Sequence, residues 1–416
     1  MKTIQPSTVQ GTLNAPASKS DMLRAIAAAY LTGARCEILN PSFCDDAKAA
    51  LGIVATLGAQ LDESPAKVVL TPGTRTPRPV LDCGESGLCI RMFPAIAALR
   101  DDEVTLTGRG SLTMRPLTML EPPLRSLGVA CRTQNGFLPV SVKGPLRAGK
   151  TVVDGSVTSQ FLTGLLMALP LCAGESEIVV NNLTSKPYIA MTLRLMETFG
   201  VTVQHNNFER FRINGPQQYH ALTYTVEGDW SGAAFPLVAG ALAGRVKVEN
   251  LRCDSTQADK AIVAVLQKAG AKVEIGANDL TVQRDRLAGF EFDATDCPDL
   301  FPPIVALAAY CQGKSTIYGA QRLKVKESDR GLALLHEFTQ IGASVALYAD
   351  RMEITGKPEL DGGIVDSHND HRIAMAGAVA ALRSRKGVTI RNWECVAKSY
   401  PNFFDDLAQI SHKSDS

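Results

Sequence analysis

The chain lacks an excess of charge of either sign. Its 416 residues include 43 lysines and arginines against 42 aspartates and glutamates, which leaves a formal net charge of +1. Proteins that bind nucleic acid in bulk usually carry a marked basic excess, so this balance argues against that class. Any anionic ligand must instead be held by a local cluster of cations.

Long hydrophobic runs and paired cysteines are missing as well. The longest apolar stretch, LLMALPLCA at 165–173, is far shorter than the roughly 20 residues that span a bilayer. The N-terminal segment MKTIQPSTVQGTLNAP has no hydrophobic signal region. The ten cysteines form no CxxC pair and many lie in apolar runs, which is typical of buried, reduced side chains. We therefore expect a cytoplasmic protein that is not bound to a membrane.

What the chain does have is an internal repeat. The segments TLGAQL, SLGVAC, TFGVTV, KAGAKV and QIGASV place glycines at 58, 128, 200, 270 and 342, at spacings of 70 or 72 residues. In each case an amphipathic helix runs into a glycine suited to a helix C-terminus, and an alternating strand follows. Short strands keep the same spacing at CEIL, VTLT, EIVV, VKVE, STIY and VTIR. The pattern predicts six βαβαββ-like modules, the last completed by the N-terminal strand.

Six modules of this size favour two globular halves of three modules each. The helices expected to begin near 20, 88, 160, 231, 300 and 371 are nearly all apolar, which predicts burial on every side. The third module ends near VEGDW at 226–230. We expect an N-terminal domain at 18–227, and a C-terminal domain of 1–17 together with 228–416.

Polar segments precede several of these buried helices. They are SKSDMLR at 18–24, CGESGLCIR at 83–91, GSVTSQF at 155–161, CPDLF at 297–301 and NDHRIAM at 369–375. A helix N-terminus offers unpaired N–H groups to an anion, although such residues can also be simple N-caps. Eight cations in register with the repeat favour anion binding: Lys19, Arg24, Arg91, Arg115, Lys326, Arg330, Arg372 and Lys398.

The segment KVKESDR at 324–330 is denser in charge than the others. Lys326 and Arg330 are four residues apart and so share a helix face, and Glu327 lies three residues before Arg330. An exposed ion-pair cluster of little energetic value is one interpretation. The other is a carboxylate that carries a proton beside a bound anion.

These motifs, with TSKPY at 184–188, closely resemble the 3-phosphoshikimate 1-carboxyvinyltransferase (EPSP synthase) family from the first strand to about residue 407. The resemblance implies an α/β fold, a two-domain inside-out α/β barrel with three repeats per domain and a cleft between the domains. It implies transfer of the enolpyruvyl group of phosphoenolpyruvate to the 5-hydroxyl of shikimate 3-phosphate, in the route to chorismate and aromatic amino acids. It further implies a monomer that needs no metal or organic cofactor and is inhibited by glyphosate.

The resemblance also implies roles for individual residues. Contacts to shikimate 3-phosphate are implied for Lys19, Ser20, Arg24, Thr158, Ser159, Gln160, Ser185, Tyr188, Asp299 and Lys326. Contacts to phosphoenolpyruvate are implied for Lys19, Gly87, Arg115, Gln160, Arg330, Arg372 and Lys398. The implied catalytic groups are Asp299, Glu327, Lys19 and Lys398. Asp299 would take the proton of the attacking hydroxyl, and Glu327 or Lys398 would serve the methylene carbon.

The chain departs from the family pattern at two places, one of which is Arg322, where some members have Asn. Many members have Asn-Ala-Gly-Thr where this chain has Glu85-Ser86-Gly87-Leu88, which adds a carboxylate and removes a hydroxyl.

Other functions remain open at this point. The related UDP-N-acetylglucosamine enolpyruvyl transferases commonly carry a loop cysteine, which RGSLTMR at 109–115 lacks, and have Asn where Ser20 stands. RNA 3′-phosphate cyclases need a basic surface that the net charge does not suggest. A non-catalytic binder of phosphorylated metabolites is the alternative from a different class.

Overall fold

The computed structural model describes residues 1–413, which divide into two compact units. One unit is Lys19–Val226, here called the N-terminal unit. The other, the C-terminal unit, combines Met1–Ser18 with the chain from Glu227 onward. The expected domain limits, residues 18 and 227, differ from these by one residue at each end.

Three four-stranded sheets make up the β structure of the N-terminal unit, and they share one pattern. The first two strands are parallel, and the remaining pairs are antiparallel. In spatial order the sheets are β14 (Thr223–Thr225), β3 (Cys36–Leu39), β5 (Lys67–Pro72) and β4 (Ala59–Glu63); β6 (Val80–Asp82), β7 (Glu103–Thr107), β9 (Phe137–Lys143) and β8 (Ala130–Gln134); and β10 (Lys150–Asp154), β11 (Gly174–Asn181), β13 (Arg210–Gly215) and β12 (Gln204–Asn206).

The C-terminal unit repeats this pattern and uses the N-terminal strands to complete it. Strand β1 pairs antiparallel with β23, and β2 pairs parallel with β15. The sheets are β16 (Lys272–Ile275), β17 (Asp279–Gln283), β15 (Gly244–Glu249), β2 (Ser7–Asn14) and β24 (Ser411–Lys413); β18 (Glu291–Asp293), β19 (Lys314–Tyr318), β21 (Arg351–Thr355) and β20 (Ser344–Leu347); and β1 (Lys2–Ile4), β23 (Val388–Arg391) and β22 (Gly363–Asp366). Six small sheets therefore match the six predicted modules, and the α/β class is confirmed.

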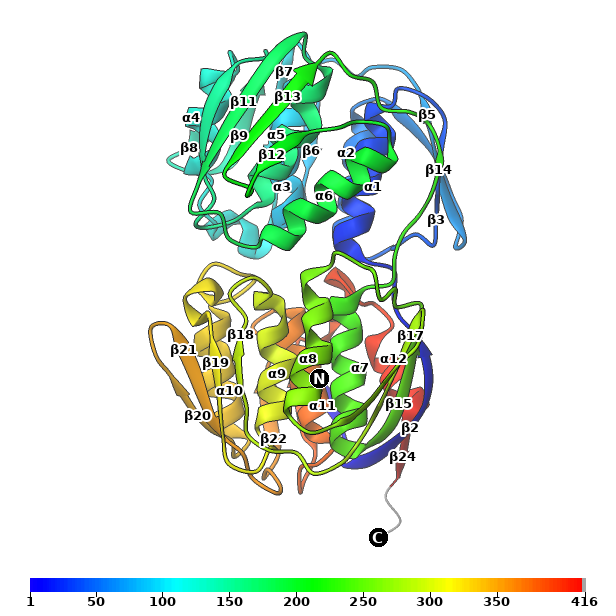
Figure 1. Ribbon diagram of the computed structural model, residues 1–416, viewed down its shortest axis with the longest axis vertical. Coiled ribbons are helices and arrows are strands. Elements are labelled where there is room, and N and C mark those ends of the chain that lie inside the picture. Colours follow the sequence, from blue (N-terminus) through cyan, green and yellow to red (C-terminus); the bar gives the residue numbers. More distant parts are fainter. Residues whose placement is uncertain (414–416) are drawn as a thin grey trace. The chain divides into compact units, whose positions relative to one another are not determined.

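Apolar helices fill the interior of each unit. They are α1 (Lys19–Leu31), α3 (Gly87–Ala97) and α5 (Gln160–Ala168) in the N-terminal unit, and α7 (Trp230–Ala243), α9 (Phe301–Ala308) and α11 (His371–Ala381) in the C-terminal unit. Every residue of α3, α7, α9 and α11 is buried, and each of the six helices begins within one residue of its expected start. Figure 1 shows α7, α9 and α11 between the sheet that holds β15 and the sheet that holds β21. Each unit therefore encloses a group of helices, and small open sheets surround these helices.

Amphipathic helices complete the modules. They are α2 (Asp45–Thr56), α4 (Glu121–Ser126), α6 (Lys186–Thr198), α8 (Ile262–Lys268), α10 (Arg330–Gln340) and α12 (Phe403–Ile410). The repeated glycines follow five of them with φ between +84° and +115°, as the helix-terminal pattern predicts. Two details differ from expectation. The amphipathic helix before Gly270 begins as a 3₁₀ turn (Ala258–Ala261), and after Gly200 the strand starts only at Gln204.

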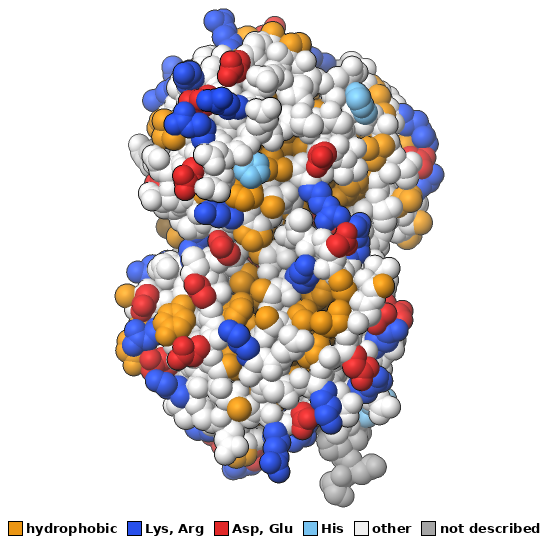
Figure 2. Space-filling model, viewed as in Figure 1, with side chains coloured by type: hydrophobic (Ala, Val, Ile, Leu, Met, Phe, Trp, Pro, Cys, Tyr) orange, Lys and Arg blue, Asp and Glu red, His pale blue; other side chains and the backbone are white. Residues whose placement is uncertain are grey.

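The surface and the cysteines agree with the composition. On the face in Figure 2, lysine and arginine side chains are intermixed with acidic ones, as the near-zero net charge predicts. All ten cysteines are free thiols and nine are buried, which confirms the sequence interpretation. Within residues 1–413, no helix has both the length and the hydropathy needed to cross a membrane.

Replacing two glycines of one module by alanine should have opposite effects on the free energy of unfolding. At Gly58 (φ +115°) an added Cβ would lie 2.7 Å from the carbonyl oxygen of Thr74, so Gly58→Ala should lower the free energy of unfolding by at least about 1–2 kcal/mol. At the exposed Gly52, inside α2, an added Cβ meets nothing within 4 Å. Gly52→Ala should therefore raise the free energy of unfolding by about 0.5–1 kcal/mol. Urea denaturation measures both, and equal effects would contradict the conformational argument.

Candidate active site

Two arginines lie at the start of α3 in the N-terminal unit. Ser86 caps this helix by accepting a hydrogen bond from the Cys89 N–H (3.3 Å), and Gly87 is its first residue. A Cβ on Gly87 would lie 2.6 Å from Nη1 of Arg115 and 3.0 Å from Nη1 of Arg91. Both arginines are buried. Two guanidinium groups at the positive end of a helix, with space that only glycine leaves, suit an anionic group.

Arg91 links this helix start to the next one. Its Nη1 donates to Oε1 of Gln160, the first residue of α5, at 3.0 Å and to the carbonyl of Gly87 at 3.3 Å. The bond turns the Gln160 carbonyl toward Arg91 and leaves the amide NH₂ to donate elsewhere. The sequence analysis counted Arg91 among the cations in register but assigned it no role. Arg91 lies four residues after Gly87 and therefore on the same helix face, and this spacing could have indicated that it belongs to the site.

Arg24 links α1 to α6, and Thr192 of α6 extends the contact to α5. Its Nη1 donates to the carbonyl of Ser20 (2.7 Å), its Nη2 to the carbonyl of Tyr188 (3.4 Å) and its Nε to Oγ1 of Thr192 in α6 (2.8 Å). Thr192 in turn lies 3.2 Å from Oγ1 of Thr163 in α5. Burial lowers the pKa of Arg24 to about 10, so the side chain remains charged at neutral pH. The structure thus brings together Ser20, Arg24 and Tyr188.

The other predicted residues of this unit also lie at helix starts. Lys19 is the first residue of α1, and its Nζ lies 3.1 Å from Oδ2 of Asp46 in α2, a carboxylate that the sequence did not single out. Thr158 accepts a bond from the backbone N–H of Gln160 (3.2 Å). Ser159 and Ser185 immediately precede α5 and α6, and Ser185 is in a left-handed conformation (φ +58°).

The departure from the family motif at Glu85 has a structural partner. The backbone N–H of Ser111 donates to Oε2 of Glu85 (3.4 Å), and Oγ of Ser111 accepts from Nη2 of Arg115 (3.4 Å). The added carboxylate is therefore directed toward the loop that carries Arg115. Leu88 is buried within α3.

The C-terminal unit gathers its charges around Asp299. This residue lies in a 3₁₀ turn (Pro298–Leu300) before α9. Its Oδ1 is 2.8 Å from Nη1 of Arg330 and 3.3 Å from Nζ of Lys326, and its Oδ2 is 3.2 Å from Nη2 of Arg372. Oε2 of Glu327 is 2.6 Å from Nη2 of Arg330. Five predicted site residues therefore form one continuous cluster.

Arg330 is the centre of this cluster and is fully buried. Its Nε lies 3.0 Å from Oδ2 of Asp370, and its Nη2 lies 3.3 Å from Oδ1. Burial alone would lower the pKa of Arg330, but the carboxylates of Asp370, Glu327 and Asp299 outweigh that effect and raise it. Burial lowers the pKa of Lys326, against the opposing effect of Asp299.

Asp370 is a site residue that the sequence analysis did not select. It is fully buried, caps α11 by accepting from the backbone N–H of Arg372 (3.0 Å), and accepts from Oγ of Ser328 (3.1 Å). An aspartate directly before a helix start predicts a cap, but its pairing with Arg330 depends on packing. Lys398 joins the same region, because its Nζ donates to the carbonyl of Asn369 at 2.7 Å.

This arrangement suits reactions of small anions. Cations held by carboxylates can exchange those contacts for a phosphate or carboxylate of a ligand, and charge-assisted arginine contacts favour such groups. Asp299 and Glu327, 23% and 20% exposed, are carboxylates that can accept or return a proton beside the bound anion. Within residues 1–413, no three His, Cys, Asp or Glu side chains are grouped so as to hold a metal ion.

Solved structures define the class. The EPSP synthase of Acinetobacter baumannii is similar over 99% of this chain and 98% of that chain, with a TM-score of 0.84 and 25% sequence identity. The enolpyruvyl transferase NikO of Streptomyces tendae shares the fold, with a TM-score of 0.78 at 17% identity over 99% of this chain and 97% of that chain. The six repeated modules and the clustered cations are thus set in the fold of the enolpyruvyl transferases.

The particular family follows from the sequence comparisons. Residues 4–407 match EPSP synthase (3-phosphoshikimate 1-carboxyvinyltransferase), and the chain belongs to this family. A protein of that name from Clostridium novyi is 38% identical over 98% of this chain and 96% of its own length. Another, from Clostridium perfringens (strain SM101), is 36% identical over 98% of this chain and 97% of its own length. The resemblance drawn from the motifs is confirmed.

The contribution of Asp370 can be measured through stability. Asp370→Asn keeps a capping oxygen for α11 but removes one of the charges that compensate the buried Arg330, so it should lower the free energy of unfolding by about 1–3 kcal/mol. Asp101→Asn is the control, because the pair of Asp101 with Arg75 is exposed and should contribute nothing measurable. Chemical denaturation of both variants makes the comparison. Equal stabilities would contradict the central place given to the Arg330–Asp370 pair.

Proposed function

We propose that this chain transfers the enolpyruvyl group of phosphoenolpyruvate to the 5-hydroxyl of shikimate 3-phosphate, releasing phosphate. Membership of the EPSP synthase family supports the reaction. The observation that carries it is the cluster in which Arg330 contacts both Asp299 and Glu327. The reaction needs two carboxylates held among cations, because it moves protons beside substrates that are themselves anionic.

The proposal assigns different tasks to the two units. In the N-terminal unit, the polar groups at the starts of α1, α5 and α6 bind shikimate 3-phosphate: Ser20, Arg24, Thr158, Ser159, Gln160, Ser185 and Tyr188. Asp299 and Lys326 of the C-terminal unit contact the same substrate. Phosphoenolpyruvate is bound by Gly87, Arg115, Gln160, Arg330, Arg372 and Lys398, and Lys19 contacts both substrates. Turnover is therefore expected to need groups of both units.

The chemistry follows from these assignments. Asp299 accepts the proton of the 5-hydroxyl while the oxygen attacks C2 of phosphoenolpyruvate, and Glu327 or Lys398 donates a proton to C3. The tetrahedral intermediate then loses phosphate from C2 and a proton from C3, which restores the double bond. The products are the enolpyruvyl ether and phosphate. The surrounding cations stabilise the phosphate as it departs.

Phosphate release tests the function directly. The protein should release phosphate when phosphoenolpyruvate and shikimate 3-phosphate are mixed, and should not do so with either substrate alone. A parallel assay replaces shikimate 3-phosphate by UDP-N-acetylglucosamine. Release only with the nucleotide sugar would contradict the proposal in favour of the related transferase. Binding of both substrates without release would identify a non-catalytic protein.

Glu327 and Arg372 should affect different kinetic constants. Glu327→Gln keeps size and polarity but cannot carry a proton, so kcat should fall by about 10²- to 10⁴-fold while shikimate 3-phosphate still binds. Arg372→Ala is the contrasting variant and should raise KM for phosphoenolpyruvate, because it removes a contact to that substrate.

Isotope exchange separates the two candidate proton donors. The wild-type protein should incorporate deuterium from solvent into the methylene of phosphoenolpyruvate when shikimate 3-phosphate is present. Undiminished exchange in Glu327→Gln would remove Glu327 from the mechanism and leave Lys398 as the donor.

A further inference from the structure

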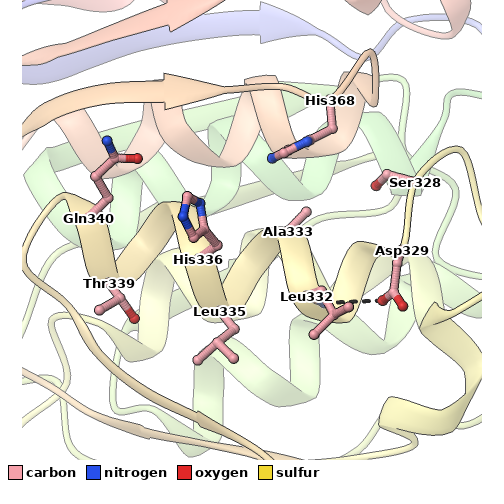
Figure 3. Close-up of a pocket in the computed structure, with 9 residues that line it drawn as sticks. All are labelled: Ser328, Asp329, Leu332, Ala333, Leu335, His336, Thr339, Gln340 and His368. Atoms are coloured by element: carbon pink, nitrogen blue, oxygen red, sulfur yellow. Dashed lines mark hydrogen bonds between the residues drawn. The ribbon is translucent and has the colours of Figure 1, made fainter.

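A pocket of about 730 Å³ lies on the outer side of α10 in the C-terminal unit. In Figure 3, His336 projects from α10 and His368 from the segment before α11 toward this pocket. The two histidines lie on segments more than 30 residues apart, and one carboxylate connects them.

That carboxylate is Glu337, which is only 2% exposed. Its Oε1 lies 2.8 Å from Nε2 of His368 and 3.0 Å from Nδ1 of His336, and its Oε2 accepts the backbone N–H of Asp366 at 2.8 Å. Both ring nitrogens lie within hydrogen-bonding distance of this one oxygen. Glu337 therefore contacts the end of β22 through Asp366 and the segment before α11 through His368.

The segment that it binds has an unfavourable backbone. Residues 367–370 connect β22 to α11, and two consecutive residues in it, His368 (φ +52°) and Asn369 (φ +57°), are left-handed. Such conformations are costly for residues other than glycine and persist only where the surroundings enforce them. Here the Oγ of Ser367 donates to the carbonyl of Asn392 (3.1 Å), and Glu337 holds the segment from the side of α10.

The same segment sets the positions of three cations of the candidate active site. The carbonyl of Asn369 accepts from Lys398, Asp370 pairs with Arg330, and Arg372 is the second residue of α11. Helix α10 itself begins at Arg330 and carries Glu337 two turns later. Glu337 thus connects the helix that begins with one site cation to the segment that positions the others.

We propose that Glu337 and His368 are positioning residues for the phosphoenolpyruvate-binding cations Arg330, Arg372 and Lys398. This inference rests on the proposed function and extends it to residues that touch neither substrate. The bond between His368 and Glu337 keeps the segment at 367–370 in the conformation that presents these cations. Weakening that bond should therefore affect phosphoenolpyruvate more than shikimate 3-phosphate.

His368→Asn isolates the contact. Asparagine tolerates the left-handed conformation, but its shorter side chain cannot place an amide where Nε2 of His368 lies. KM for phosphoenolpyruvate should rise by about 2- to 30-fold, the range typical of coupling through a neighbouring residue, while KM for shikimate 3-phosphate changes less than twofold. His368→Gln, whose amide nitrogen reaches as far as Nε2, should recover part of the loss.

His336→Ala is the matched control. His336 contacts the same oxygen of Glu337, but it is 74% exposed and lies on α10, outside the segment that carries the cations. Its removal should leave both KM values unchanged.

The outcomes separate positioning from a merely structural role. A His368→Asn protein with a lowered Tm and unchanged KM values would overturn the inference, as would an equal rise in both KM values or an equal effect of His336→Ala. If the wild type releases phosphate and His368→Asn keeps the wild-type KM values, this inference alone is overturned. A wild type that releases no phosphate from the two substrates would overturn the proposed function, and this inference with it.

Discussion

The fully buried guanidinium of Arg330 is the constraint on which the rest of the C-terminal unit depends. A charge out of water costs several kcal/mol unless it is paired and hydrogen-bonded. Here the pairing comes from Asp299 before α9, Glu327 before α10 and Asp370 at the start of α11. The three segments are held together because each supplies one carboxylate to the same side chain.

The buried helices explain why these charges can be placed so closely. Helices such as α9 and α11 are apolar on all sides, so only their first residues can be polar, and the polar residues of successive modules gather at the helix starts. In the N-terminal unit, hydrogen bonds to neutral oxygen atoms orient Arg24 and Arg91. In the C-terminal unit, carboxylates orient Arg330 and Arg372. The proposed reaction assigns its proton transfers to Asp299 and to Glu327 or Lys398, all in the C-terminal unit.

Support for the site extends beyond the residues that would touch substrate. Asp46 pairs with Lys19, Arg91 turns the amide of Gln160, and Asp370 pairs with Arg330. Glu85, where the chain departs from the family motif, is bonded to the loop before Arg115. Each of these side chains fixes a donor or a charge of its own unit before any ligand binds.

The sequence alone determined the repeated modules, the buried helices and their first residues, because these follow from local periodicity, glycine and the polarity of neighbouring residues. The register of the cations along the chain followed from the same pattern, and the motifs sufficed to indicate the family. The partners of those cations could not be read in this way. Asp370 and Arg330 are 40 residues apart, and His368 and Glu337 are 31 residues apart. Only the tertiary structure decided these pairs, because they depend on how α9, α10 and α11 pack together, and local periodicity carries no information about the distance between side chains on different helices.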